Sequence, residues 1–379
     1  MIRLSPTMKA LLVIFSLSTL LAAPSRAAEP PSVWAARVPG GGAIGRVVVP
    51  APGDARFAHL SWPKAVRAKD GAIVLAYIAG TFHGTHGGGS PAVSISTDGG
   101  RTFTPPRVLR EFAKGRDYTQ SGNVALGVAE DGALVLLAMA FDDDAGNNIF
   151  GWRSTDAGRT WTPTDTSALG PDKTGSVFGN IIEVPGRGLT ALGHYRAPSK
   201  PYSKGIWMAS SKDAGKSWGE AVQITDVSAL EPVLIRAEGR LIAFLRATSM
   251  AGTQFVSVSD DGGATWKTER SVLGPESGAL YNVVAPCAVV NPQKPGEVFV
   301  LTTERSKTDL PGRIWLWKGD ARKLDWKRER VLLEFPKEKT QNDLGYPWLV
   351  HVEGRRWLMF YYHGRNHGAN SIWSVEVEL

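Results

Sequence analysis

The sequence predicts an all-β fold, a six-bladed β-propeller, and three observations indicate it. Four segments share the pattern Ser-x-Asp-x-Gly-x-Thr/Ser-aromatic, and their aspartates, 58, 57 and 48 residues apart, are Asp98, Asp156, Asp213 and Asp261. A second series of turn glycines recurs every 53 to 61 residues between apolar or β-branched runs, at Gly71, Gly132, Gly186, Gly239, Gly296 and Gly354. Helical periodicity is nearly absent. Four-stranded units at this interval are typical of propeller blades.

Each repeat reads as strand, turn, strand, loop, strand, box turn and strand. In the box, Ser and Asp can hydrogen-bond the backbone of a tight turn, Gly adopts a positive φ, and the aromatic ring packs on the sheet. We therefore interpret the four Asp boxes as scaffold. The fifth unit keeps the spacing without the box, and the sixth ends after its third strand. We expect residues 43–50 to supply the missing strand and close the ring.

The N-terminus has the pattern of a secretory signal peptide over residues 1–27. Arg3 and Lys9 precede an apolar run at 10–23, and small residues precede a cleavage site after Ala27. The run is shorter than the roughly 20 residues that a bilayer requires, so we expect a secreted or periplasmic protein without stable membrane association after cleavage. Residues 28–42 then form a linker, and residues 43–379 a single propeller domain.

Composition narrows the possible functions. With 43% hydrophobic residues, the chain can bury a large core, which excludes a disordered protein. Cys287 is the one cysteine, which excludes an intramolecular disulfide and a Cys-rich metal site. After cleavage the chain keeps 40 basic and 36 acidic residues, a net charge of +4, and it has no basic run. Nucleic acid is therefore not an expected partner, and the charge slightly favours anionic ligands.

Chain direction separates the two faces of such a fold. Strand one of each unit leaves one face and turns at the other, so both series of turns lie on the far face. Residues that begin strand one, or that follow strand two, therefore meet at the near face. The near-face residues with useful chemistry are Lys64, Glu231, Tyr281 and Tyr346 at strand starts, and His83, His86, His194, Tyr195, Arg246 and Arg305 in the loops.

Four Asp boxes on a six-fold repeat resemble the sialidase superfamily. Residues 231–246 resemble an element in which a Glu opens an inner strand and an Arg closes the returning one. The resemblance implies that Glu231 polarises a tyrosine nucleophile and that Arg246 binds the substrate carboxylate. Residues 343–350 resemble a final-blade element and place Tyr346 at the pocket as that nucleophile. A neutral phenol avoids the repulsion that a carboxylate nucleophile meets on an anionic sugar.

The chain also departs from the family. Ser61-Trp62-Pro63 stands where the family has Arg-Ile-Pro, so the first carboxylate-binding arginine is absent unless Lys64 replaces it. The loop at residues 80–89 lacks the family's acid/base aspartate, and His83 or His86 is expected in its place. The start of unit five, residues 277–282, offers no third arginine. His83-x-x-His86 also has a metal-ligand spacing, but no further ligands follow in sequence, and neither a metal nor a cofactor is expected.

Three functions remain open, each with a glycan partner. The first is an exo-glycosidase that hydrolyses a terminal acidic sugar, sialic acid or a relative, with Tyr346, Glu231, His83 and His86 as catalytic residues. The second is a polysaccharide lyase acting on uronates, with His83 or His194, Tyr195 or Tyr346, and Arg246. The third is a non-catalytic glycan-binding propeller. The expected substrate-binding residues are Arg246, Lys64, His194, Tyr195, Tyr281 and Trp348.

Overall fold

The computed structural model describes residues 35–40, 42–84, 87–142, 146–249, 252–275, 281–306, 310–336 and 343–379. All of them lie in the second of two compact units, Val33–Leu379. The predicted signal peptide and most of the predicted linker lie outside the described residues. Within these ranges, no helix is both long enough and apolar enough to cross a membrane.

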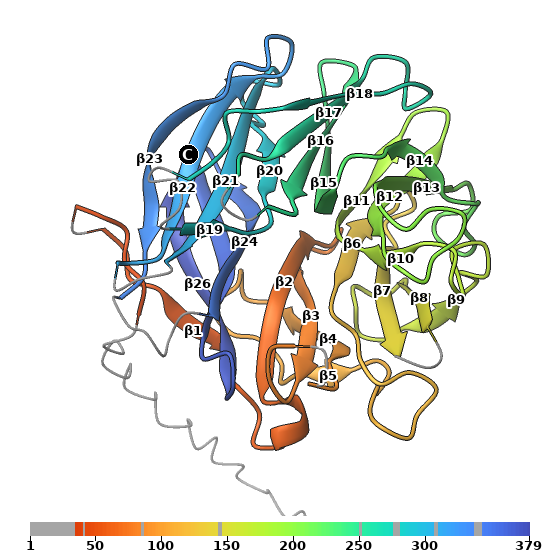
Figure 1. The fold of residues 1–379 in the computed structure, drawn as a ribbon. Helices are drawn as coiled ribbons and strands as arrows, with labels where there is room; N and C mark the ends of the chain where they lie inside the picture. The colour runs from red at the N-terminus through yellow and green to blue at the C-terminus, as the bar shows by residue number, and fades with distance from the viewer. Residues whose placement is uncertain are drawn as a thin grey trace, which may run out of the picture. The chain divides into compact units, whose positions relative to one another are not determined.

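The all-β prediction is confirmed, since the described elements are strands apart from the 3-10 helix η1 (Ala55–Phe57) (Figure 1). The first two groups of strands are β2 (His59–Arg67), β3 (Ile73–Gly80), β4 (Ser90–Ser96) and β5 (Arg107–Val108), then β6 (Val124–Val128), β7 (Leu134–Asp142), β8 (Gly146–Ser154) and β9 (Thr162–Thr164). The third is β10 (Gly175–Val177), β11 (Gly179–Val184), β12 (Gly188–Tyr195), β13 (Ile206–Ser211) and β14 (Val222–Thr225). The fourth is β15 (Ala229–Ala237), β16 (Arg240–Ala247), β17 (Phe255–Ser259) and β18 (Lys267–Arg270).

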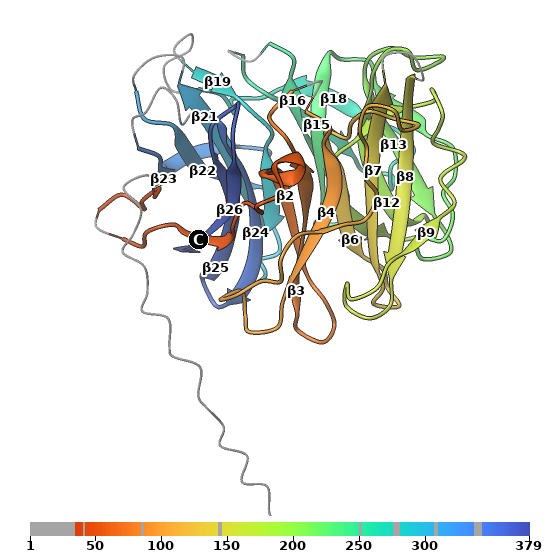
Figure 2. The same ribbon diagram turned by 90° about the horizontal axis from the view of Figure 1, so that it is seen from below.

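The fifth group is β19 (Tyr281–Val283), β20 (Cys287–Val290), β21 (Glu297–Ser306), β22 (Arg313–Asp320) and β23 (Lys327–Glu334). The sixth is β24 (Asp343–Glu353), β25 (Arg356–Gly364) and β26 (Asn370–Glu378). Strands within a group pair antiparallel, and Figure 2 shows them lying along one another. β11 also pairs with β6 of the preceding group in parallel.

Contacts between neighbouring groups close a ring. The inner strands β2, β6, β11, β15, β20 and β24 each contact the next in this order, and β24 contacts β2. The strand expected from residues 43–50 is β1 (Arg46–Val49), which pairs antiparallel with β26. The N-terminal strand therefore covers the edge that the sixth group would otherwise expose.

The second strand of a group is covered on both faces by its neighbours, and its sequence reflects this. All eight residues of β3, IVLAYIAG, are buried, and the Tyr77 side chain is fully enclosed. Such a strand is a continuous apolar run rather than an alternation of apolar and polar residues, because neither face meets water.

The Asp boxes fold as hydrogen-bonded turns. Asp98 Oδ1 accepts from Ser96 Oγ at 2.8 Å and from the Thr102 backbone N–H at 3.0 Å, while Oδ2 accepts from Thr102 Oγ1 at 2.6 Å. Burial opposes ionisation, but these bonds hold the pKa of Asp98 well below its usual range. Asp156, Asp213 and Asp261 make equivalent bonds. The box carboxylates are therefore engaged in their own turns.

Candidate functional site

A cavity of about 260 Å³ opens on the side of the ring where the inner strands begin. All six strand groups contribute to its walls. Its principal polar and aromatic residues are His59, Ser61, Trp62, His83, Gln120, Ser121, Asn123, Arg196, Glu231, Arg246, Asn282, Arg305 and Tyr346. Side chains that are distant in sequence therefore meet at the near face, where chain direction places them.

Tyr346, Glu231 and Arg246 form one hydrogen-bonded group in this cavity. The Tyr346 hydroxyl donates to Glu231 Oε1 at 2.8 Å, and Arg246 Nη1 donates to Glu231 Oε2 at 2.6 Å. Arg246 Nη1 also lies 3.0 Å from the Tyr346 oxygen. Each of the three residues is less than a tenth exposed. The phenol is therefore placed directly against a carboxylate that can take its proton.

An unusual backbone conformation directs the Glu231 and Tyr346 side chains into the cavity, and Trp62 has the same conformation. Trp62, Glu231 and Tyr346 each precede a proline and have left-handed φ angles of 55°, 47° and 52°. Each also lies at an irregularity in the pairing of its strand with the following one. A non-glycine residue in this conformation is strained, and such strain collects at functional sites. Trp62 thus occupies the same structural position in the first group as Glu231 and Tyr346 do in theirs.

The electrostatics favour an ionised Glu231 beside a neutral Tyr346. Burial alone would raise the pKa of the Glu231 carboxyl, but the Arg246 charge and the bonds from Arg246 and Tyr346 hold it below its usual range. Burial, and then the negative charge of Glu231, raises the pKa of Tyr346 well above its ordinary value. The phenol therefore needs a proton acceptor in order to attack, and Glu231 is in contact with it.

Arginines give the cavity a positive lining. Arg305 and Arg196 line it together with Arg246, against one lining carboxylate, Glu231. The Arg305 Nε donates to the Leu344 carbonyl at 2.9 Å, which holds the guanidinium 5.5 Å from the centre of the Tyr346 ring. Arg305, one of the expected near-face residues, comes from the end of β21, so the fifth group supplies an arginine although its first residues, 277–282, offer none.

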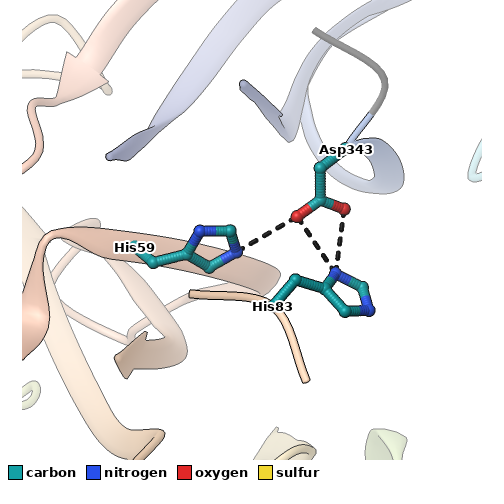
Figure 3. A group of neighbouring side chains, drawn as sticks. All are labelled: His59, His83 and Asp343. Atoms are coloured by element: carbon teal, nitrogen blue, oxygen red, sulfur yellow. Dashed lines mark hydrogen bonds and ion pairs between the residues drawn. The ribbon is translucent and has the colours of Figure 1, made fainter. Parts of the chain in front are cut away.

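A second polar group lies beside the first and consists of His59, His83 and Asp343 (Figure 3). His83 Nδ1 is 3.0 Å from both carboxylate oxygens of Asp343, and His59 Nε2 is 3.1 Å from Oδ2. His59 and Asp343 are buried, whereas the His83 side chain is 32% exposed and lines the cavity. One ligand atom from each lies within 4.8 Å of the others, so the three residues could also hold a metal ion.

Three buried polar atoms in the cavity wall have no hydrogen-bond partner among the described residues. They are Ser61 Oγ, Ser121 Oγ and Arg246 Nε. Since buried polar groups are nearly always hydrogen-bonded, atoms of this kind in a cavity wall indicate where a ligand or ordered water binds. Hydroxyls and a guanidinium N–H suit the hydroxyl and carboxylate groups of a sugar.

Two expected substrate-binding residues lie under the cavity rather than in it. Lys64 is fully buried, donates to the carbonyls of Trp62 and Pro63, and lies 3.9 Å and 4.9 Å from the ring centres of Phe178 and Trp348. Its expected role as a replacement arginine is wrong, because the irregularity between Ser61 and Lys64 turns the side chain inward. Trp348 packs against Lys64 and does not line the cavity either. Burial lowers the pKa of Lys64 to about 7.

The remaining expected residues lie elsewhere. His194 and Tyr195 line a neighbouring cavity of about 400 Å³ that shares Asn123, Arg196 and Glu231 with the first. His194 lies behind Glu231, and its Nδ1 accepts from the Glu231 backbone N–H at 3.3 Å. Burial lowers the pKa of His194 to about 4, which makes it a poor base for the lyase reading. His86 and the side chain of Tyr281 lie outside the described residues.

The expected site residues do not include His59, Trp62 or Asp343, and they give Arg305 no role. The sequence contains a signal for two of these residues. Trp62-Pro63 repeats the pattern of Glu231-Pro232 and Tyr346-Pro347 at the inner strands, and Asp343 opens the strand that carries Tyr346. His59 has no such signal, because it begins β2 ahead of the strand's apolar run.

Comparisons with known proteins agree with this architecture. Residues 111–359 match the family model described as a BNR repeat-like domain. The structure is similar to a protein of unknown function from Dyadobacter fermentans, with a TM-score of 0.66 and 21% identity over 88% of this chain and 98% of that one. It is similar to the Hadza microbial sialidase Hz136, with a TM-score of 0.67 and 19% identity over 88% and 68% of the two chains. It is also similar to the NanB sialidase of Streptococcus pneumoniae, with a TM-score of 0.68 and 12% identity over 88% of this chain and 70% of that one.

A comparison with curated proteins gives no match. At these identities, the similarity to solved structures concerns the fold and not the activity. The family model, in contrast, spans more than half of the chain and includes three of the four Asp boxes. The chain belongs to the BNR repeat-like domain family, and its fold is similar to that of solved sialidases.

Proposed function

We propose that the protein is an exported exo-acting glycoside hydrolase that removes a terminal acidic sugar from a glycan, and that its six strand groups are the blades of a propeller. The observation that carries the proposal is the Tyr346 hydroxyl, which donates to Glu231 at 2.8 Å inside a cavity lined by three arginines. A tyrosine nucleophile is the known alternative to the usual pair of glycosidase carboxylates.

In the first step, the Tyr346 oxygen attacks the anomeric carbon while its proton passes to Glu231. The glycosidic carbon–oxygen bond breaks, and the leaving oxygen takes a proton from the protonated His83 imidazole. In the second step, water attacks the sugar–tyrosine bond and gives a proton to His83, and Tyr346 recovers its proton from Glu231. The sum is the addition of one water across the glycosidic bond.

The lining selects for a negative charge on the substrate. Among the described residues, three arginines and one carboxylate line the cavity. Arg246 pairs with Glu231 and Arg305 with the buried Asp343, but each guanidinium has further N–H groups that can donate to a substrate carboxylate. The volume of about 260 Å³ lies just below the roughly 300–1,000 Å³ of most ligand pockets. A space of this size suits one sugar residue better than a continuous chain, which favours action at a terminus.

Elimination is the second candidate, and the observation in its favour is His83 beside Asp343 in a cavity that also holds a tyrosine. In a lyase, an imidazole or phenolate would remove the proton next to a uronate carboxylate, and an arginine would offset the charge that develops. Where Tyr346 would have to protonate the leaving group, its bond to Glu231 is a disadvantage, because a phenol that gives its proton to a carboxylate has none for the leaving oxygen.

Product masses separate these possibilities. The mature chain and its Tyr346→Phe variant are incubated with sialylated and uronate-terminated oligosaccharides. Hydrolysis predicts fragments that together gain one water, with one acidic sugar released by the wild type and at least about a thousandfold less by the variant. Fragments that sum to the substrate, one of them unsaturated, would establish the lyase. Binding of these oligosaccharides with no new fragment would leave a glycan-binding protein.

A further inference from the structure

Asp343 is the most heavily bonded carboxylate near the cavity. It opens β24 three residues before Tyr346 and is fully buried. Its Oδ1 accepts from the Tyr362 hydroxyl at 2.8 Å and lies 3.2 Å from Arg305 Nη2. Its Oδ2 accepts from Asn370 Nδ2 at 3.3 Å, and both oxygens face His83. Burial alone would raise the pKa of Asp343, but these donors and the adjacent cations hold it far below its usual range.

The His59 ring lies between two groups that can only accept hydrogen bonds. Nδ1 lies 2.9 Å from the Gly368 carbonyl oxygen, which can only accept, so Nδ1 carries a proton. Nε2 lies 3.1 Å from the ionised Asp343 Oδ2, which also only accepts. Asn370 Nδ2 also lies 3.4 Å from His59 Nε2. His59 Nε2 and Arg305 Nη2 thus each lie against one oxygen of Asp343.

His83 is the member of the group that substrate can reach. Its Nδ1 sits at equal distance from the two Asp343 oxygens, and an N–H there satisfies both. The ring edge meets the Trp62 indole, with 5.0 Å between ring centres, and the His83 backbone N–H donates to the Asn366 carbonyl at 2.8 Å. Among the described residues, none forms a hydrogen bond with His83 Nε2. Figure 3 shows this nitrogen directed away from Asp343.

From this arrangement we infer that Asp343 is the positioning residue for proton transfer by His83, and that His59 and Tyr362 lock Asp343 in place. The carboxylate holds the proton on Nδ1, so Nε2 is the nitrogen that gives a proton to the leaving oxygen and later takes one from water. The inference rests on the proposed hydrolysis. It assigns to an Asp–His pair the step for which the family uses an aspartate in the loop at residues 80–89.

The groups around His83 show which of them can position its ring. The charged and titratable groups that face it are Asp343 and Tyr362 behind it, His59 and Arg305 beside Asp343, His367 against the neighbouring Phe82, and Glu231, Arg246, Arg196 and Tyr346 across the cavity. Among the described residues, Asp343 is the one carboxylate in contact with the ring.

The test compares Asp343→Asn and His83→Gln with the wild type on two substrates of the same acidic sugar, one with an alkyl alcohol leaving group and one with nitrophenol. Asparagine keeps the size of the side chain and removes its charge. We expect kcat on the alkyl glycoside to fall about 10²- to 10⁴-fold in both variants, with KM changed less than about threefold. The nitrophenyl glycoside needs little proton donation in the first step, so its kcat/KM should fall less than about tenfold. Its kcat should fall further, because His83 also takes the proton from water in the second step.

The difference between the two substrates is the readout that a merely structural role would not move, because a misfolded or loosened site would lose activity on both alike. Asp98→Asn, in an Asp box on the far face, is the matched control and should change kcat/KM on neither substrate. Because His83 is partly exposed, His83→Gln keeps the test informative if Asp343→Asn does not fold.

Three results would overturn the inference. Equal losses of kcat/KM on both substrates would mean that neither residue serves proton donation. Wild-type kcat/KM of a folded Asp343→Asn protein on the alkyl glycoside would remove the positioning role. One zinc ion per purified chain, with activity lost to a chelator and regained with zinc, would place a metal ion between these residues instead of a proton. Failure of the proposed function is distinct, because the wild type would then release unsaturated fragments or none.

Discussion

Tyr346 and Glu231 are 115 residues apart in the chain, yet the Tyr346 hydroxyl donates to Glu231 Oε1 at 2.8 Å. The contact depends on the ring, because β15 and β24 belong to the fourth and sixth strand groups, and β20 of the fifth contacts both. It also depends on two left-handed residues, each before a proline, that turn both side chains toward the cavity. Neither strand alone would hold a phenol against a carboxylate in a buried site.

Replacing Glu231 with Gln should leave a folded protein that binds its sugar and turns it over slowly. The amide keeps a partner for the Tyr346 hydroxyl but cannot take its proton. We expect kcat to fall roughly 10³-fold while KM changes by less than about fivefold. Steady-state kinetics on a released acidic sugar give both values. A variant with kcat within tenfold of the wild type would exclude Glu231 as the base.

Arg246 and Glu231 should depend on each other for stability. Both are buried, and Arg246→Met leaves the Glu231 charge without its cation, which should cost about 3–5 kcal/mol of unfolding free energy. In a Glu231→Gln background the same change should cost at least about 2 kcal/mol less, because no buried charge is left unpaired. Urea unfolding of the four proteins measures this coupling. Additive losses would show that the pair is not coupled.

His194 should make stability depend on pH between about 6.5 and 4. Burial lowers the pKa of His194 to about 4 in the folded protein, so in this window the unfolded chain binds a proton that the folded protein does not. Unfolding free energy therefore falls as pH drops through the window, by about 3 kcal/mol for this residue. His194→Gln cannot titrate, and its amide oxygen can accept the bond from the Glu231 backbone.

The measurement for His194 is urea unfolding of both proteins at pH 7, 5.5 and 4. The difference between wild type and His194→Gln should shift steadily in favour of the variant as the pH falls. Other groups that titrate in this range, the Asp-box carboxylates among them, are common to both proteins and cancel in the difference. Parallel curves would mean that His194 titrates alike in the folded and unfolded states.

Trp62 should strengthen the binding of the substrate. Its indole stands 5.0 Å from the His83 ring centre and 6.3 Å from that of Tyr346, in the cavity wall. An aromatic face at this position can pack on the apolar face of a sugar. We expect Trp62→Ala to raise KM about 10- to 100-fold and to lower kcat by less than about tenfold, while Trp62→Phe stays near the wild type. An unchanged KM in Trp62→Ala would contradict this role.

Asp98 should matter to stability and not to catalysis. Its carboxylate ties the turn of the first Asp box through bonds to Ser96, Arg101 and Thr102. Asp98→Ala should lower the unfolding free energy by about 1–2 kcal/mol, as the loss of a capping side chain does elsewhere. At a temperature where the variant is folded, kcat/KM should equal that of the wild type. A tenfold loss of kcat/KM there would place this box in the active site.

The repeat and the group of Glu231, Arg246 and Tyr346 can be predicted from the sequence, because both depend on short sequence patterns. The boxes carry their turn chemistry within eight residues. Glu231 and Tyr346 lie near the starts of inner strands, and Arg246 lies near the end of the strand that returns from one. Their placement on one face follows from period and strand direction, whereas their roles come from the resemblance to the sialidase superfamily.

The sequence does not reveal how deeply a side chain is buried or where the pairing of two strands is irregular. Lys64 lies two residues after the left-handed Trp62, and the shifted pairing there turns it beneath the cavity, where simple alternation would not place it. His59 and Asp343 begin strands that extend further than their apolar runs indicate. Arg305 enters from the end of β21, so its approach to Tyr346 depends on how two groups pack.

The measurement that tests the central claim most directly is mass spectrometry of the protein after reaction with a fluorinated glycosyl fluoride of an acidic sugar, which forms the sugar–enzyme bond quickly and hydrolyses it slowly. The account predicts that the chain gains one glycosyl residue, that the added mass maps to the peptide containing Tyr346, and that Tyr346→Phe gains nothing. Steady turnover of the natural glycoside with no adduct, or an adduct on any other residue, would contradict a Tyr346 nucleophile.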